Sequence, residues 1–233
     1  MIMNTHGKPL IALATALLLA GCASNGDPRD PLEPYNRSMH SFNEGVDRVV
    51  LKPLAKGYQA IAPSPVQSGV RNFYSNLDDV TVFANNLLQF KLEQASSDLL
   101  RVVFNSSFGL LGLIDIATPM GLKKHNEDFG QTLGRWGVAS GPYLVLPFFG
   151  PSSFRDGVGL AVDTATTDLV YQIEDIPTRN GTLALRVVSR RADLIDAKEA
   201  IEEAALDNYE FTRDFYLEHR KALVQDGRPS ATE

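Results

Sequence analysis

The stretch GPYLVLPFFGPSSFRDGVG, residues 141–159, combines an apolar run with prolines and glycines. Residues 143–149 are apolar or aromatic apart from their proline, yet Pro142, Pro147 and Pro151 exclude a continuous helix and would remove donors from a central strand. The run is also far shorter than the roughly 20 residues that a helix needs to cross a bilayer. We therefore predict a kinked, non-helical apolar segment.

The N-terminus is typical of a signal peptide that ends at a lipidation site. Residues 1–21 contain one cation, Lys8, followed by an apolar run and then Leu-Ala-Gly-Cys, which resembles a bacterial lipobox. A plain secretory signal with a chance cysteine is less favoured, because Cys22 is the only cysteine and lies at the cut site. We predict that Cys22 carries acyl chains and that residues 22–31 are a lipidated tether. No aspartate follows Cys22, so the outer membrane is the predicted destination.

The charge of the chain argues against nucleic acid as a partner. The formal net charge is −6, and removal of residues 1–21 takes away Lys8 and no acid, which leaves −7. Phosphate backbones demand clustered lysine and arginine, and a basic amphipathic membrane binder would need them too. The remaining residues are enough for one sizeable domain without internal disulfides.

The periodicity of the apolar residues predicts a mostly α-helical protein. Steps of three and four residues, with proline and glycine as breaks, place the helices. They are expected at about 35–50 with a kink or restart at Pro53, from Ser64 onward in one or two pieces, over 92–104, from 152–155 toward 173, and over 181–222 in one or two pieces. We predict a single helical domain over 32–222 and a disordered tail over 223–233, and the sequence shows no clear alternating strand pattern.

Catalytic motifs are weak in this sequence. The Asp-Phe-Gly triplet at 128–130 lacks the other kinase motifs, and Ser140 does not lie in a Gly-x-Ser-x-Gly elbow. The histidines are isolated, so no metal site is predicted, and His125 is expected in a solvated turn. We predict no enzymatic activity and no cofactor.

Six blocks of the sequence, from about Asp30 to Asp163, carry a family resemblance. They are DPLEPYNRSMHSFNEGVDRVVLKPLAKGY, VRNFYSNLDD, NNLLQ, FNSSFGLLGLIDIA, HNEDFGQTLGRWGV and SGPYLVLPFFGPSSFRDGVG. In this order, after a lipobox, they resemble the MlaA/VacJ family of outer-membrane lipoproteins. The C-terminal third contributes only an amphipathic pattern.

The resemblance implies a ring-shaped helical protein that lies in the inner leaflet of the outer membrane and has a central amphipathic channel. It further implies that phospholipids misplaced in the outer leaflet enter this channel and pass to a periplasmic lipid-carrier protein of the Mla system. A trimeric outer-membrane porin is the implied docking partner. The expected result is maintenance of lipid asymmetry.

Three sets of residues are candidate functional sites under this hypothesis. The channel wall or membrane-facing rim is predicted to include Tyr143, Leu144, Val145, Leu146, Pro147, Phe148 and Phe149. The glycine-rich stretch with Gly134, Gly137 and Gly141 is predicted to be a mobile gate loop. Met39, Phe42 and Asn43 are predicted to lie on a helix close to the lumen.

Two other functions remain open from the sequence. A non-transporting lipoprotein scaffold associated with porins would share the anchor and the helices but need no channel. An envelope lipase would need a nucleophile–base pair that the sequence does not display. The apolar segments could also be loops buried in a soluble core, although irregular backbone leaves polar groups to satisfy there.

Overall fold

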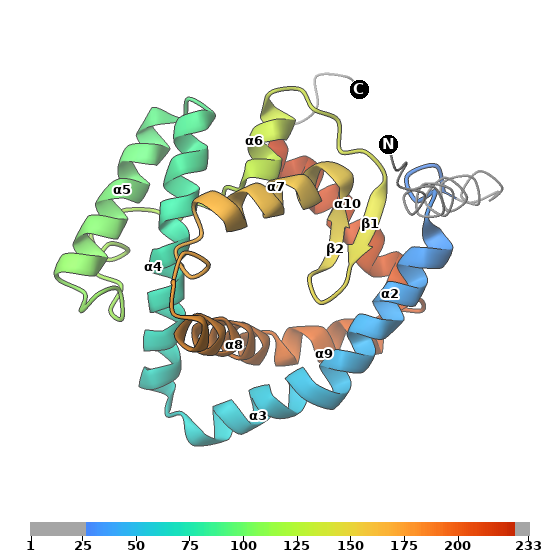
Figure 1. Cartoon of the computed structure of the whole chain (residues 1–233), viewed down its shortest axis with the longest axis horizontal. Helices are drawn as coiled ribbons and strands as arrows, with labels where there is room; N and C mark the ends of the chain where they lie inside the picture. Colours follow the sequence, from blue (N-terminus) through green and yellow to red (C-terminus); the bar gives the residue numbers. More distant parts are fainter. Residues whose placement is uncertain (1–26, 227–233) are drawn as a thin grey trace, which may run out of the picture.

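A computed structural model describes residues 27–226, which form a mostly helical fold with one β-hairpin (Figure 1). The prediction of a mostly helical protein is confirmed. The elements in chain order are α2 (Glu33–Val46), the π-helical turn η2 (Asp47–Leu51), α3 (Lys52–Ile61), α4 (Ser64–Leu88), α5 (Leu92–Ser107), α6 (Phe129–Arg135), β1 (Tyr143–Leu146), β2 (Gly150–Ser153), α7 (Phe154–Thr166), α8 (Ile176–Asp193), α9 (Ile195–Ala204) and α10 (Asn208–Val224).

Prolines and short polar side chains set where the helices begin. α2, α4 and α8 each have a proline in the first turn, where its missing N–H costs no hydrogen bond. α6, α7, α8 and α10 begin behind Asp128, Ser153, Asp175 and Asp207, whose side chains accept hydrogen bonds from backbone N–H groups of the first turn. The predicted restart at Pro53 occurs at the junction of η2 and α3.

The elements surround a central opening, by which we mean the space enclosed by α4, α7, α8, α9 and the hairpin (Figure 1). α2, η2 and α3 form one arc, α4 forms the next, and α6 and α7 continue the circuit toward the hairpin. α8 and α9 lie inside the arc of α3, and α5 packs on the outer side of α4. α10 contacts both α6 and β2, so it joins the two ends of the circuit.

Several sequence predictions need correction. Residues 143–153 contain an antiparallel hairpin in which Tyr143 faces Ser153 and Leu146 faces Gly150, whereas the sequence shows no clear alternating strand pattern. The prolines fit because a two-stranded sheet has two open edges. α10 extends to Val224, into the predicted tail, and residues 27–31 of the predicted tether belong to the fold, since Asp30 is fully buried. Cys22 and the rest of the tail, 227–233, lie outside the described residues.

Buried side chains in this fold are mainly polar. Within residues 27–226, twenty-one polar or charged residues are buried, against eleven apolar ones. Many of these buried groups bond to one another: Asn86 Nδ2 donates to Asp98 at 2.7 Å, and Asp98 also contacts the His125 ring at 2.7 Å, so His125 does not lie in a solvated turn. Because a protein in water buries its large apolar side chains first, this distribution favours an apolar environment around the molecule.

Candidate functional site: the lining of the central opening

Four pockets follow one another around the central opening. Their volumes are about 320, 280, 520 and 380 Å³. The first two share Asp78 and Arg190, the second and third share Leu160, the third and fourth share Phe149, and the fourth and first share Leu194. The shared residues therefore close a continuous lining around the opening.

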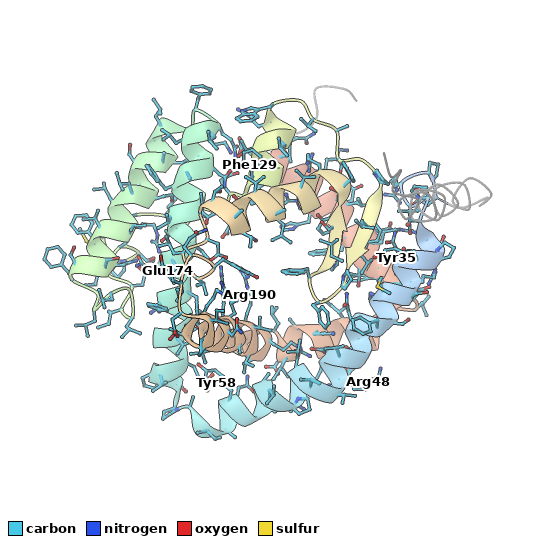
Figure 2. The ribbon with its side chains drawn as sticks, in the orientation of Figure 1. Tyr35, Arg48, Tyr58, Phe129, Glu174 and Arg190 are labelled. Atoms are coloured by element: carbon cyan, nitrogen blue, oxygen red, sulfur yellow. The ribbon has the colours of Figure 1, made fainter. Side chains whose placement is uncertain are left out.

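One side of this lining is polar and comes from α4, α8 and the segment before α6. Arg186 of α8 pairs with Asp168 at 2.7 Å and also with Asp78 of α4. Asn126 lines the same two pockets. Arg190 follows Arg186 by four residues and extends toward the middle of the opening (Figure 2). This polar wall was not predicted from the sequence. The available signal was the spacing of Arg186 and Arg190, which places two cations on one face of a helix.

A second part of the lining is apolar and comes from the hairpin turn and α7. Leu146, Pro147 and Phe149 line one pocket together with Leu160 and Ala161 of α7. These residue types offer no charge and, apart from the backbone, no hydrogen-bonding group. The opening thus has a hydrocarbon stretch at the hairpin turn and α7, whereas charged side chains line the rest of it, including Glu44, Asp47 and Lys198.

Two asparagines of α2 hold the free edge of the hairpin. Asn36 donates to the Tyr143 carbonyl at 3.0 Å and accepts from the Val145 N–H at 2.8 Å. Asn43 donates to the Leu146 carbonyl at 3.0 Å and accepts from the Phe148 N–H at 2.8 Å. A side-chain amide has the same donor and acceptor as a peptide, so the pair replaces a third strand. Their spacing of seven residues places both on one face of the helix.

The structure separates the predicted wall residues into two groups. Leu146, Pro147, Phe148 and Phe149 line pockets of the opening, as does the edge of the almost fully buried Val145. Tyr143 is fully buried and packs against Tyr209 and Val145, and Leu144 lines none of the four pockets. The assignment of Tyr143 to the wall was therefore wrong; burial in this cluster raises the pKa of its hydroxyl.

The three residues predicted near the lumen lie on the side of α2 that meets the hairpin. Asn43 lines a pocket of the opening, and Phe42 contacts Phe148 edge to face with 5.3 Å between ring centroids. Met39 packs against the buried cluster of Tyr143, Val145 and Tyr209 instead. Only Asn43 of this set reaches the lining.

The predicted gate loop is shorter than expected. Gly134 lies inside α6, and a Cβ there would approach Arg155 Nη1 and Val224 Cγ2 to 2.8 Å, so this glycine serves close packing and not loop mobility. Gly137 and Gly141 lie in the following loop with φ values of +92° and +70°. Both adopt the left-handed region, which glycine enters without strain. The role of this loop as a gate stays a prediction.

The apolar loop after α5 is exposed, so the alternative of a buried soluble-core loop is wrong for it. Polar side chains of α5 satisfy its irregular backbone: Asn105 Oδ1 accepts from the N–H groups of Ile116 and Ala117 at 2.8 and 2.9 Å, and Arg101 donates to the Leu122 carbonyl at 2.8 Å. The exposed apolar residues of this region, here called the outer belt, are Leu92, Leu99, Leu100, Val103, Phe108, Leu110, Leu111, Leu113 and Ile114. Contiguous apolar exposure of this kind marks contact with lipid or a partner.

None of the helices within residues 27–226 combines the length and the hydropathy that a bilayer crossing requires. The outer belt instead follows one side of α5 and the loop behind it.

The fold and its lining define a class of helical protein that buries mainly polar side chains, exposes apolar side chains on its outer face and surrounds an opening lined by both kinds. The family model described as MlaA lipoprotein matches residues 28–223. The chain is 35% identical over 228 residues to the "Intermembrane phospholipid transport system lipoprotein MlaA" of Haemophilus influenzae, covering 94% of this chain and 91% of that protein. It is 33% identical over 225 residues to the protein of the same name in Escherichia coli K12, covering 93% and 88%.

A solved structure described as "Structural basis for maintenance of bacterial outer membrane lipid asymmetry" superposes with a TM-score of 0.73 and 31% identity, covering 84% of this chain and 98% of that one. Sequence and structure agree, and the chain belongs to the MlaA lipoprotein family.

Proposed function

We propose that this protein removes phospholipids from the outer leaflet of the outer membrane through its central opening and passes them to a periplasmic lipid carrier, which maintains lipid asymmetry. The names of its relatives support phospholipid transport, and a lining that offers both charged and apolar stretches supports the route. The single observation that carries the proposal is this lining, because a phospholipid has one charged end and two apolar chains.

The energetics explain why such a route needs no catalytic group. A phospholipid with two chains of about 16 carbons exposes roughly 30 methylenes, and at about 0.8 kcal/mol each its free passage through water costs about 24 kcal/mol. An apolar wall of Leu146, Pro147, Phe149 and Leu160 offers hydrocarbon contact to the chains. The charged wall keeps the headgroup in a polar path.

The same proposal covers the position of the protein in the membrane. The outer belt and the polar interior support a ring that lies within the inner leaflet, with acyl chains on Cys22 as the anchor. Docking beside a trimeric porin is part of the proposal and is supported by the family resemblance. The alternative, a non-transporting porin-associated scaffold, gives no role to the lining of the opening.

We predict that purified protein in the bilayer of donor vesicles speeds the transfer of labelled phospholipid to a soluble carrier, and that Gly137→Ala slows it. Gly137 has φ of +92° and open space around it, so an added methyl group strains the loop by about 1–2 kcal/mol without a clash. The measurement is the initial rate of transfer. Carrier without this protein gives the background rate.

Gly121→Ala is the matched control, since Gly121 also has positive φ, +87°, and open space, but lies in a different loop, between α5 and α6. Equal rates for wild type and background would refute the proposed function. Equal slowing by both alanine variants would refute the gate role of the Gly137 loop but not the proposal that the protein transports phospholipid.

A further inference from the structure

Arg190 differs from every other cation of the lining. Six lysine or arginine side chains line the four pockets: Arg71, Lys124, Arg186, Arg190, Arg191 and Lys198. Five of them have a carboxylate within ion-pair distance, from Asp193, Asp79, Asp78 and Asp168, Asp47, and Glu44 and Asp47, respectively. The Arg190 guanidinium has no ion pair or hydrogen-bond partner among residues 27–226.

The position of Arg190 directs it toward anything that occupies the opening. It lies in the last turn of α8, it is exposed, and it lines both polar pockets. Figure 2 shows its side chain extending into the opening. An unpaired guanidinium presents five donors in a planar fork that fits the oxygens of a phosphate bidentately.

One helical turn away, the wall carries an excess of negative charge. A single guanidinium, that of Arg186, serves two carboxylates, those of Asp78 and Asp168. Oδ1 of Asp78 takes the Arg186 bond, while its Oδ2 has no hydrogen-bond partner among the described side chains. Residues four apart share a helix face about 6 Å from each other along the axis. Asp78 and Arg190 line the same two pockets, so the wall offers a free cation and a free carboxylate oxygen to one occupant.

We propose that Arg190 binds the phosphodiester of a lipid headgroup inside the opening, and that Asp78 accepts a hydrogen bond from an ammonium carried on the same headgroup. This inference rests on the proposed function and names the substrate class: zwitterionic phospholipids of the phosphatidylethanolamine type. An anionic headgroup such as phosphatidylglycerol keeps the contact with Arg190 and loses the contact with Asp78.

The test uses donor vesicles with equal amounts of labelled phosphatidylethanolamine, phosphatidylglycerol and diacylglycerol. Arg190→Gln is expected to lower transfer of both phospholipids about tenfold, the loss that follows from one charge-assisted hydrogen bond to a phosphate. Diacylglycerol lacks the phosphate, so its transfer should not change. Arg190→Lys should restore part of the phospholipid rate, because it keeps the charge but not the fork.

Arg179→Gln is the matched control. Arg179 lies on the same helix, has no ion pair among the described residues, and lines none of the four pockets. Its loss should leave all three rates unchanged.

Asp78→Asn tests the ammonium contact separately. It leaves Arg186 paired with Asp168 and should lower the ratio of phosphatidylethanolamine to phosphatidylglycerol transfer. An unchanged ratio overturns the zwitterion assignment.

The outcomes distinguish the two levels of the proposal. Wild-type protein that transfers no lipid refutes the proposed function. Wild-type protein that transfers phospholipid, with Arg190→Gln equally active, refutes only the headgroup site. If Arg190→Gln slows diacylglycerol transfer as much as phospholipid transfer, the headgroup site is also overturned. Arg190 would then support the structure of the protein and would not bind a phosphate.

Discussion

Replacing Arg220 with Met is expected to cost about 3–5 kcal/mol of unfolding free energy at pH 7, the loss typical of a broken buried ion pair. Arg220 of α10 bonds Asp128 at 2.5 and 2.9 Å and Asp156 at 2.9 and 3.0 Å. These carboxylates lie at the beginnings of α6 and α7, so the guanidinium joins three elements of the ring. Met fills similar space and leaves both acids without their shared partner.

The loss of unfolding free energy in Arg220→Met is expected to depend on pH. Burial alone would raise the pKa of Asp128 and Asp156, but the Arg220 guanidinium outweighs it and holds both below the ordinary value of 3.8. Wild-type stability from this cluster is therefore present above pH 3.8 and is lost as pH falls through the depressed pKa values. Without Arg220, burial raises both pKa values, so the destabilisation should be larger at pH 7 than at pH 4.

Denaturant unfolding of the purified variants at both pH values measures the effect. Lys221→Met is the control, because Lys221 is exposed on the same helix and has no ion pair among the described residues; its effect should stay within about 0.5 kcal/mol. A loss below about 1 kcal/mol for Arg220→Met, equal at pH 4 and pH 7, would mean that the cluster does not hold α10 to the ring.

Deleting Ser41 from α2 is expected to turn the protein into a leak that carries phospholipid toward the outer leaflet. One missing residue rotates the preceding part of the helix by about 100° relative to the rest. Asn36 and Asn43 then no longer share a face, and only one of them can hold the edge of β1. Each backbone group left unpaired at the buried edge costs about 1–3 kcal/mol.

The measurement is the amount of phospholipid in the outer leaflet of cells that produce the deletion variant beside the wild-type protein. A leak should raise it even when wild-type protein is present. Asn43→Ala is the control for register, because it removes the clamp at the hairpin tip and keeps Asn36 in place; we expect a smaller rise. A deletion variant that behaves only as a loss of function would assign this part of α2 to core packing.

The sequence predicted the helices better than it predicted which of their faces are buried. Periodicity and proline placed the starts of α3 and α4, because these signals are local. On α5, however, the apolar Leu99, Leu100 and Val103 are exposed, and the buried positions include Asp98 and Arg101. Hydrophobic periodicity separates the apolar face of a helix from its polar face, but it does not say which face contacts lipid and which is buried.

The hairpin and the charged wall could not be predicted because their partners are distant in sequence. β1 is held on its free edge by side chains of α2 more than a hundred residues earlier, and a strand pattern contains no sign of such a partner. Arg186 meets Asp78 across 108 residues in the same way. Of the predicted wall residues 143–149, the turn from Pro147 to Phe149 lines pockets of the opening, whereas Tyr143 is buried in the core beneath it; contact of the turn with lipid stays a prediction.

Chemical obstruction at Phe149 tests the route through the opening most directly. The chain has one cysteine, Cys22, whose thiol is blocked when acylated, so Phe149→Cys offers a single reactive thiol at a residue shared by two pockets of the lining. After labelling with a bulky maleimide, phospholipid transfer from vesicles should fall to the level of vesicles without protein. Leu206→Cys, fully exposed in the link between α9 and α10 and outside all four pockets, should transfer lipid normally when labelled. Unchanged transfer by labelled Phe149→Cys would contradict passage through the opening.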